Sequence, residues 1–345
     1  MVFAIILLLL LIVSVLFNAG ALVTSVFHTK GVVSRTVGPR FEEVITEDND
    51  AGDKLAVVDI QGIITSRITE QGGFNMVELI RAQLKRAQDD HKVKAVILKV
   101  DSPGGEVLAS DEIYRAIWDF QKKGKPVIAS MGNLAASGGY YVSAPCQWIV
   151  ANDLTITGSI GVILHSWNYR GLMNKVGLRP ETYKSGKYKD MLSGERNPDE
   201  IPPEEREMVQ TLIDQTYGRF KEVVAEGRKQ AHSKNKDNKA AKDQGRPLTA
   251  DWASYADGRV LSGSEAYKLG FVDQLGNFRD AVERAQALAG ISSANLIEYR
   301  QHYDFSDLFR LFGKTETPVV KVDLGMDVPK LQAGQLYFLS PTFTH

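Results

Sequence analysis

The segment Ala95-Val96-Ile97-Leu98-Lys99-Val100 is followed without a break by Asp101-Ser102-Pro103-Gly104-Gly105. The first part is a nearly continuous apolar run rich in β-branched residues, which is typical of a strand buried on both faces of a parallel sheet. The second part favours a turn, because proline removes a backbone donor and glycine adopts conformations that other residues rarely reach. A buried strand that ends in a glycine turn predicts an α/β fold.

The flanking sequence repeats this alternation of strand and helix. Before the segment, Leu55–Ile60 is a short apolar strand candidate, and a helix capped by Asn75 is expected to end near Gln88. After it come a helix, a strand, a short helix and two strand candidates, over 107–122, 126–130, 135–144, 148–150 and 162–164. This spacing predicts a parallel sheet covered by helices, with the chemistry in loops at the carboxyl ends of strands.

One of these loops places a small hydroxyl among residues too small to shield it. Ser137 stands in Ala135-Ala136-Ser137-Gly138-Gly139, at the start of the expected short helix. A serine at this position is most often only a helix cap. A bare hydroxyl that faces backbone N–H groups is also the minimal equipment for acyl transfer, and the amides of Gly105 and Gly138 are candidate donors to an oxyanion. The chain must then supply a base.

Two residues compete for the role of base. His165 is the histidine nearest to Ser137 in the sequence, but it follows an apolar run, and a place in the core or at a strand end is the simpler interpretation. Lys189 stands in Tyr183–Asp190, a polar segment with three lysines that most often indicates a solvated loop. A lysine base must also be partly buried to lose its charge near neutral pH. The residues alone leave this choice open.

The C-terminal half is expected to be mainly helical. Its predicted elements are helices over 202–224, 263–270 and 277–289 and a short strand over 271–273. Ser262 and Glu265 have capping-box spacing at the start of the second of these helices. Glu226–Arg246 is polar and rich in lysine and arginine, which indicates a solvated loop or a frayed helix. The alternative for this tract is a basic patch for acidic lipid headgroups.

The composition excludes several classes of protein. A formal net charge of -1 over 345 residues, with 43% apolar and 24% charged residues, fits an ordinary globular protein and argues against a nucleic-acid partner. The single cysteine, Cys146, cannot form an internal disulfide, and the six histidines show no metal-ligand spacing. We therefore expect neither a metal site nor a cofactor.

The N-terminus differs from the rest of the chain. Val2–Phe27 carries no charged residue, and its apolar run is long enough to cross a bilayer core. We expect a single membrane anchor over 1–27, followed by a linker over 28–53. A cleaved signal peptide is the alternative, because Ala19-Gly20-Ala21 has the form of a cleavage site. The nearest cations follow the run, which by the positive-inside rule would place the body in the cytoplasm. A sequence that omits a short basic segment before the apolar run would show the same distribution of charges. We therefore expect the catalytic domain to be extracytoplasmic.

Five segments together resemble the signal peptide peptidase A family of serine proteases. They occur in the family's order and at similar spacing, within about residues 54–290. These segments are Asp101–Gly105, Asn133–Tyr141, Thr157–Val162, Ser185–Asp190 and Asp257–Gly263. The combination is highly specific, whereas a Ser-Pro-Gly-Gly turn by itself also resembles turns of Clp proteases and other crotonase-like folds.

The resemblance implies a Ser–Lys dyad that works without histidine. Carried over by motif, Ser137 is the nucleophile and Lys189 is the general base. Ser159 matches the serine that hydrogen-bonds and orients that lysine. Gly105 and Gly138 match the oxyanion positions.

The resemblance also implies an architecture. The fold would be a crotonase/Clp-like α/β superhelix of repeated β-β-α units behind a transmembrane helix. The protease domain would cover 54–290, with a peripheral extension over 291–345. The chain would form a homo-oligomer, an octamer, in which neighbouring chains complete each site. Its substrates would be signal-peptide remnants and other apolar extended peptides. Arg259 and Gly263 lie in a family motif that we interpret as structural.

Two other functions remain as alternatives. An acyl-CoA enzyme on a crotonase-like fold would use the glycine turns without needing Ser137. A non-catalytic membrane scaffold would need neither Ser137 nor Lys189. The apolar segment Gly334–Ser340 also has two interpretations. It is a peripheral strand, or it lies in the substrate groove of its own or a neighbouring chain as an internal competitor.

Overall fold

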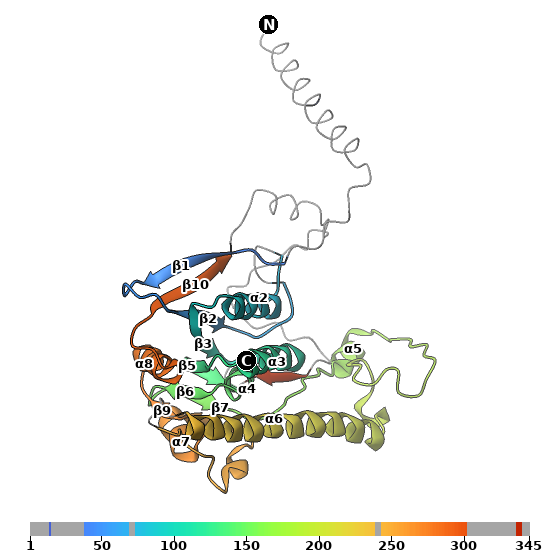
Figure 1. Cartoon of the computed structure of the whole chain (residues 1–345). Coiled ribbons are helices and arrows are strands. Elements are labelled where there is room, and N and C mark those ends of the chain that lie inside the picture. The colour runs from blue at the N-terminus through green and yellow to red at the C-terminus, as the bar shows by residue number, and fades with distance from the viewer. Residues whose placement is uncertain (1–13, 15–37, 69–72, 239–242, 302–335, 340–345) are drawn as a thin grey trace. The chain divides into compact units, whose positions relative to one another are not determined.

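A computed structural model describes residues 14, 38–68, 73–238, 243–301 and 336–339 (Figure 1). The chain divides into two compact units, Met1–Gly38 and Pro39–His345, and the elements below belong to the second. Across the described residues, no helix is both long enough and apolar enough to span a membrane. The expected membrane segment 1–27 lies outside the described residues apart from Ser14.

Nine strands of the described residues form one sheet. They are β1 (Phe41–Glu47), β2 (Lys54–Gln61), β3 (Val93–Ser102), β5 (Val127–Ala136), β6 (Trp148–Ala151), β7 (Ile156–Gly158), β8 (Val260–Ser262), β9 (Gln274–Leu275) and β10 (Asn295–Gln301). The main path is β1-β10-β2-β3-β5-β6-β9, and β7 pairs with β5 and β8. The central pairs from β2 to β9 are parallel, which confirms the predicted α/β class.

Helices cover both faces of this sheet (Figure 1). They are α2 (Met76–Asp89), α3 (Val107–Lys122), α4 (Gly138–Ser143), α5 (Arg170–Val176), α6 (Pro203–Asp237), α7 (Gly263–Leu269) and α8 (Phe278–Ala289). Val96 and Leu98 of β3 pack in one core with residues of α2 and α3, whereas Ala95 and Ile97 pack on the opposite face with α8. This strand is therefore buried on both faces, as its apolar run predicts.

The starts of the helices follow the predicted local signals. Asn75 caps α2 through a capping box with Glu78, and Ser262 caps α7 through a capping box with Glu265. Each pair satisfies two backbone N–H groups that a helix start leaves without a partner. Gly270 ends α7 in the left-handed conformation, at φ 80°.

Three predicted boundaries are wrong. The helix expected from Ala135 begins at Gly138, because Ala135 and Ala136 still belong to β5 and pair with β7. The expected strand over 162–164 is reduced to a single bridge at Ile163. The segment 271–273 is buried but irregular, and the short strand β9 follows it.

Two strands come from segments expected to lie outside the protease domain. β1 lies in the predicted linker, and β10 lies in the predicted peripheral extension. They pair antiparallel with each other, and β10 pairs parallel with β2. Leu296 and Ile297 of β10 are buried in the two cores, so this strand covers an edge of the sheet that would otherwise expose apolar side chains and backbone groups.

The polar tract over 226–246 is not a loop in its first half, because α6 continues to Asp237. Phe220, Val223, Gly227, Arg228 and Ala231 form one buried face at helical spacing. Because Arg228 is a charged residue at a core position, the apolar periodicity of this helix cannot be recognised in the sequence. The alternative interpretation as a headgroup-binding patch does not apply to Arg228, which is buried against the sheet.

Candidate active site

Two glycine segments meet at the carboxyl edge of the sheet, as their places after β3 and β5 predict. The short strand β4 (Gly104–Glu106) follows β3, and α4 follows β5. A methyl group built on Gly138 would lie 3.0 Å from the Gly105 amide nitrogen and 3.0 Å from Gly104 Cα. Only glycines allow the two backbones to approach this closely.

Ser137 occupies a strained position at the start of α4. Its φ is 53°, in the region that residues other than glycine seldom adopt, and its ψ is −115°. Its backbone N–H donates to the Gly158 carbonyl at 2.9 Å. The residue is 1% exposed, and among the described residues its Oγ has no hydrogen-bond partner. A turn that holds a buried hydroxyl in this way stores strain and keeps the oxygen available for chemistry.

Ser159 lies beside the backbone of Ser137. Ala136 and Gly158 are paired where β5 and β7 end, and the two serines are the next residues of these strands. Ser159 also has a positive φ, of 49°, and its N–H donates to the Arg259 carbonyl at 2.7 Å. The structure thus brings Ser137 and Ser159 to the same edge.

The motif that includes Arg259 contacts the backbone at this edge of the sheet. The Arg259 carbonyl holds the Ser159 backbone, and the Arg259 guanidinium forms an exposed ion pair with Asp257 at 2.6 Å. Hydrogen bonds from Arg259 lower the pKa of Asp257 to about 2. A methyl group on Gly263 would lie 1.9 Å from the Asn152 carbonyl oxygen, so this position requires glycine. The structural interpretation of both residues fits these contacts.

The C-terminal strand β11 (Tyr337–Leu339) lies against the glycine turn. It pairs antiparallel with β4, which places Phe338 opposite Gly105. On its other side Tyr337 and Ile163 exchange two backbone hydrogen bonds, of 3.1 and 3.2 Å. The strand therefore fills a slot between β4 and the segment around Ile163.

Gly104 brings β11 next to the start of α4. Its φ is 102°, and a methyl group on it would lie 2.0 Å from the Phe338 carbonyl oxygen and 2.6 Å from the Gly138 amide nitrogen. The Phe338 carbonyl and the Gly138 N–H thus lie on the same side of this glycine. The Phe338 ring is fully buried, with its centroid 4.8 Å from the Tyr141 ring and 4.7 Å from the Phe220 ring.

Lys189 lies in a different part of the molecule. We call residues 164–202, which include α5, the arm; Figure 1 shows it extending beyond the sheet, and α6 running back from it along the sheet. Lys189 is exposed on the arm. Since Ser137 Oγ has no hydrogen-bond partner among the described residues, the two side chains are not joined within one chain.

The three lysines of the Lys189 segment differ in their partners. Lys184 forms an ion pair with Asp190 at 2.7 Å, and Lys187 lies over the Tyr188 ring at 4.8 Å from its centroid. The Lys189 side chain forms no ion pair or hydrogen bond with any described residue. Spacing alone does not distinguish these lysines, and the family motif is what selects Lys189.

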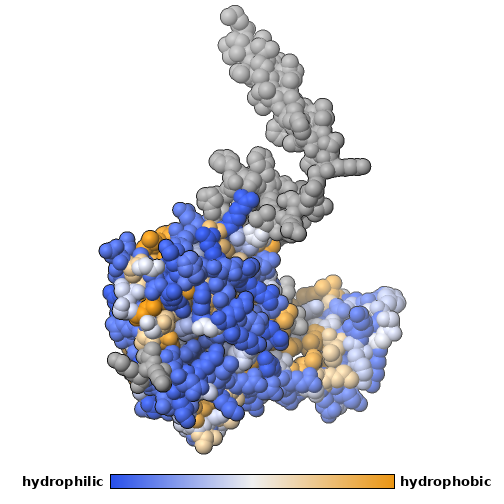
Figure 2. Space-filling view, viewed as in Figure 1, coloured by the Kyte–Doolittle hydropathy of each residue, from blue (hydrophilic) through white to orange (hydrophobic). Residues whose placement is uncertain are grey.

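His165 is exposed on the arm, so a place in the core is wrong, and it follows the single bridge at Ile163 by two residues. The apolar run before it is only partly buried, because this part of the chain has little packed against it. Several apolar side chains of the arm are exposed as well, among them Leu172, Val176 and Leu178. Figure 2 shows apolar surface gathered on the arm.

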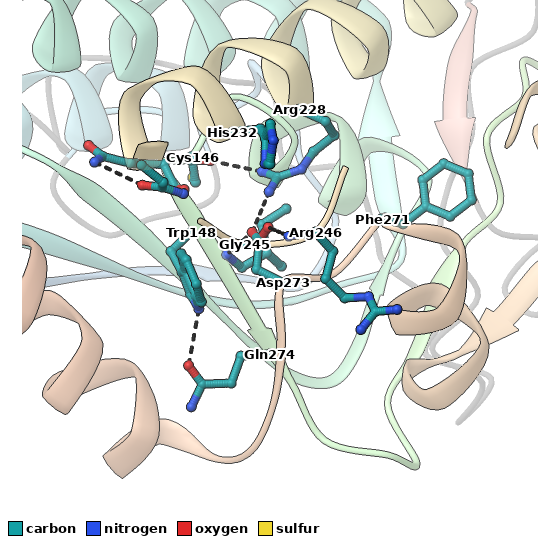
Figure 3. A network of polar contacts seen from close by, with 12 residues as sticks. Cys146, Trp148, Arg228, His232, Gly245, Arg246, Phe271, Asp273 and Gln274 are labelled. Atoms are coloured by element: carbon teal, nitrogen blue, oxygen red, sulfur yellow. Dashed lines mark hydrogen bonds and ion pairs between the residues drawn. The ribbon is translucent and has the colours of Figure 1, made fainter. Parts of the chain in front are cut away.

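A buried ion pair, which sequence analysis missed, anchors the far end of α4 (Figure 3). Arg228 of α6 donates to the Cys146 carbonyl at 2.9 Å and forms an ion pair with Asp273. Asp273 also accepts from the Ile149 N–H at 2.9 Å. α4, which follows Ser137, is thereby tied to α6 and to the sheet. Burial raises the pKa of the Cys146 thiol, which argues against a nucleophilic role for this residue.

Comparison with known proteins gives a consistent result. The sequence profile of peptidase family S49 matches residues 119–254 and 243–292. A candidate signal peptide peptidase SppA of Enterococcus faecium is 36% identical over 262 residues, which cover 75% of this chain and 70% of that protein. A candidate protease of Synechocystis is 40% identical, covering 69% of this chain and 75% of that protein. Protease 4 of Haemophilus influenzae is 35% identical over 70% of this chain and 36% of its own length.

Proposed function

Because this chain belongs to peptidase family S49, the signal peptide peptidase A family of serine peptidases, we propose that it is a membrane-anchored endopeptidase with a Ser–Lys dyad. Its substrates are apolar, extended peptides such as signal-peptide remnants. The proposal of an anchor rests on the uncharged run Val2–Phe27, and an extracytoplasmic catalytic domain is part of the same proposal. The repeated β-β-α superhelix of crotonase-like proteins is the arrangement that we propose for the fold.

The observation that carries the proposal is the position of β11 beside the predicted oxyanion glycines. An extended peptide that replaces β11 would pair with β4 through its backbone and place a carbonyl next to Gly138, as Phe338 does. Backbone pairing gives affinity for any extended chain, and side-chain pockets give specificity. The aromatic rings of Tyr141 and Phe220, which contact Phe338, suit a large apolar side chain. An apolar peptide is therefore the substrate class that fits this slot.

The chemistry follows from the groups at this edge. Uncharged Lys189 takes the proton of Ser137 Oγ while that oxygen attacks the peptide carbonyl. The N–H groups of Gly105 and Gly138 stabilise the oxyanion. The tetrahedral intermediate then collapses, the C–N bond breaks, and the protonated Lys189 gives its proton to the leaving amine. Water, activated by Lys189, hydrolyses the acyl-enzyme and regenerates the Ser137 hydroxyl. Ser159 orients the lysine beside Ser137.

A second copy of the chain supplies the lysine in this proposal. The arm is tied to Glu205 at the start of α6, and α4 contacts α6 at Phe220, 15 residues later. This separation corresponds to about 22 Å along the helix, at a rise of 1.5 Å per residue. Exposed apolar side chains on the arm are typical of a surface that binds a partner. A homo-oligomeric ring, an octamer by resemblance, would bring Lys189 of one chain to Ser137 of the next and shield it from water.

Substitution of either dyad residue tests the proposal. Hydrolysis of an apolar peptide should fall below about 1% of the wild-type rate in both Ser137→Ala and Lys189→Ala, because removal of any one member of a catalytic unit lowers the rate by more than about 100-fold. Higher residual activity in either variant would contradict the dyad. Activity should rise with pH as the lysine loses its proton, whereas a bell centred near 6.5 would indicate His165.

A further inference from the structure

The conformation of the Lys189 loop does not come from a hydrophobic core. Tyr183–Arg196 contains only turns, such as those closed by the Lys189 N–H to the Gly186 carbonyl and by the Ser193 N–H to the Asp190 carbonyl. No side chain of the arm is fully buried among the described residues. A loop with so little apolar packing needs another source of order if it is to present one side chain in a fixed direction.

Ion pairs provide that order. The Arg196 guanidinium donates twice from one nitrogen to the Glu205 carboxylate, at 2.7 and 2.9 Å, and from another to the Glu200 carbonyl at 3.1 Å. Its Nε lies 3.5 Å from a carboxylate oxygen of Asp190, the residue after Lys189. We call Asp190, Arg196 and Glu205 the clamp. It connects the Lys189 loop to the first turn of α6.

The clamp is well shielded from water, which sets it apart from the surface ion pairs of the molecule. The side chains of Arg196 and Glu205 are 13% and 3% exposed. A carboxylate as buried as that of Glu205 costs free energy unless it is paired. Loss of Arg196 would leave the Glu205 carboxylate buried without its cation, which would destabilise this part of the structure. The hydrogen bonds that Arg196 donates to the Glu205 carboxylate raise the pKa of Arg196 and favour the charged guanidinium.

The clamp also determines the charge beside Lys189. Asp190 is paired with Lys184 at 2.7 Å as well as with Arg196, and the hydrogen bond from Lys184 lowers its pKa. A carboxylate engaged by two cations is not available to Lys189. An unengaged carboxylate next to the lysine would favour the charged ammonium, which cannot act as a base.

We propose that Arg196 is a positioning residue for the base, because it fixes the Lys189 loop to Glu205 and, together with Lys184, engages the Asp190 carboxylate beside Lys189. This inference rests on the proposed Ser–Lys dyad and adds a residue to it. Arg196 touches neither Ser137 nor the peptide slot in the described structure. It acts through Lys189.

The test is the rate at which a fluorophosphonate labels Ser137 in the full-length protein between pH 6 and 10. Arg196→Met should lower the plateau rate about tenfold and shift the pH midpoint upward by about one unit, since removal of the Arg196 charge leaves Asp190 paired with Lys184 alone and makes the surroundings of Lys189 more negative. Arg196→Lys should restore the midpoint, because it keeps the charge. It should restore the rate only in part, because a single ammonium group cannot contact Glu205, the Glu200 carbonyl and Asp190 as the three guanidinium nitrogens do.

Charged residues lie in the arm from Lys184 onward and in the first turn of α6. They include Lys184, Lys187, Asp190, Glu195, Arg196, Glu200, Glu204 and Glu205. Arg279→Met is the control, because Arg279 lies in α8, outside the arm and α6, and pairs with Glu47 at 2.9 Å. It should leave both the plateau and the midpoint at their wild-type values.

The outcomes separate this inference from the proposed function. If Lys189→Ala labels as fast as wild type, the dyad is wrong and the clamp has no base to position. If Lys189→Ala is slow but Arg196→Met matches Arg279→Met, the clamp inference alone is overturned. A lower plateau rate in Arg196→Met with an unchanged midpoint would show that the clamp only supports the structure of the arm, which would contradict its proposed effect on Lys189. Glu205→Gln, which preserves the shape, gives a second measure should Arg196→Met fold poorly: it should slow labelling, and a plateau equal to that of Arg279→Met would overturn the clamp inference.

Discussion

The region around Ser137 and the arm around Lys189 achieve order by different means. Ser137 is buried at the end of a sheet strand, and glycine contacts and backbone hydrogen bonds fix its surroundings. Lys189 is exposed, and ion pairs rather than packing fix its loop. The surroundings of the proposed nucleophile are thus formed within one chain. A lysine base needs a dry environment, and a second copy of the chain is what would provide it.

The largest effect is expected where the Ser137 region is most tightly built. Gly104→Ala places a methyl group 2.0 Å from the Phe338 carbonyl oxygen and 2.6 Å from the Gly138 nitrogen, at a φ of 102°. Fluorophosphonate labelling should fall more than about 100-fold, the loss typical when an oxyanion donor is displaced. Gly62→Ala is the matched control, because Gly62 also has a positive φ, of 71°, but open space around it. Equal labelling of the two variants would show that the close approach at Gly104 is irrelevant.

The tie between α4 and α6 should matter for stability. Arg228→Met leaves Asp273 buried without its partner, which should lower the free energy of unfolding by about 3–5 kcal/mol. Chemical denaturation measures this loss. Lys85→Met removes an ion pair with Asp89 in which both side chains are largely exposed, and it should produce no measurable change. A loss below 1 kcal/mol in Arg228→Met would contradict the claim that this ion pair anchors α4.

The smallest effect is expected from the C-terminal tail. If β11 competes with substrates for the slot beside β4, deletion of residues 334–345 should raise the turnover of an apolar peptide by a few-fold. Unchanged kinetics would show that the tail is a peripheral strand. A lower melting temperature would show instead that the buried Phe338 side chain is needed for the stability of the fold.

Local patterns were sufficient to predict the centre of the fold. The apolar run before Asp101 predicts a doubly buried strand, and the Asn75 and Ser262 signals predict two helix starts, because in each case the cause lies within a few residues. The pairing of β1 with β10 joins Phe41 to Gln301, and no local signal connects segments so far apart. The length of α6 was missed because Arg228 interrupts the apolar period while still lying in the core.

The candidate site was predictable to the same extent. Ser137 and its glycines form one local motif, and the topology brings Gly105 to it as expected. Resemblance to the family motif selects Lys189 among the three lysines, whereas the contacts of Lys184 and Lys187 form only in three dimensions, and sequence spacing carries no information about them. Arg196 and Glu205 were missed for the same reason.

The most direct test of the account mixes two inactive proteins. Ser137→Ala chains keep the lysine, and Lys189→Ala chains keep the serine, so co-expression in equal amounts should assemble some sites with both groups. Random placement in a ring should restore about one quarter of the wild-type peptidase activity, because each site then draws its serine and its lysine from two different neighbours. Activity that stays at the level of the separate variants would contradict the claim that neighbouring chains share the site.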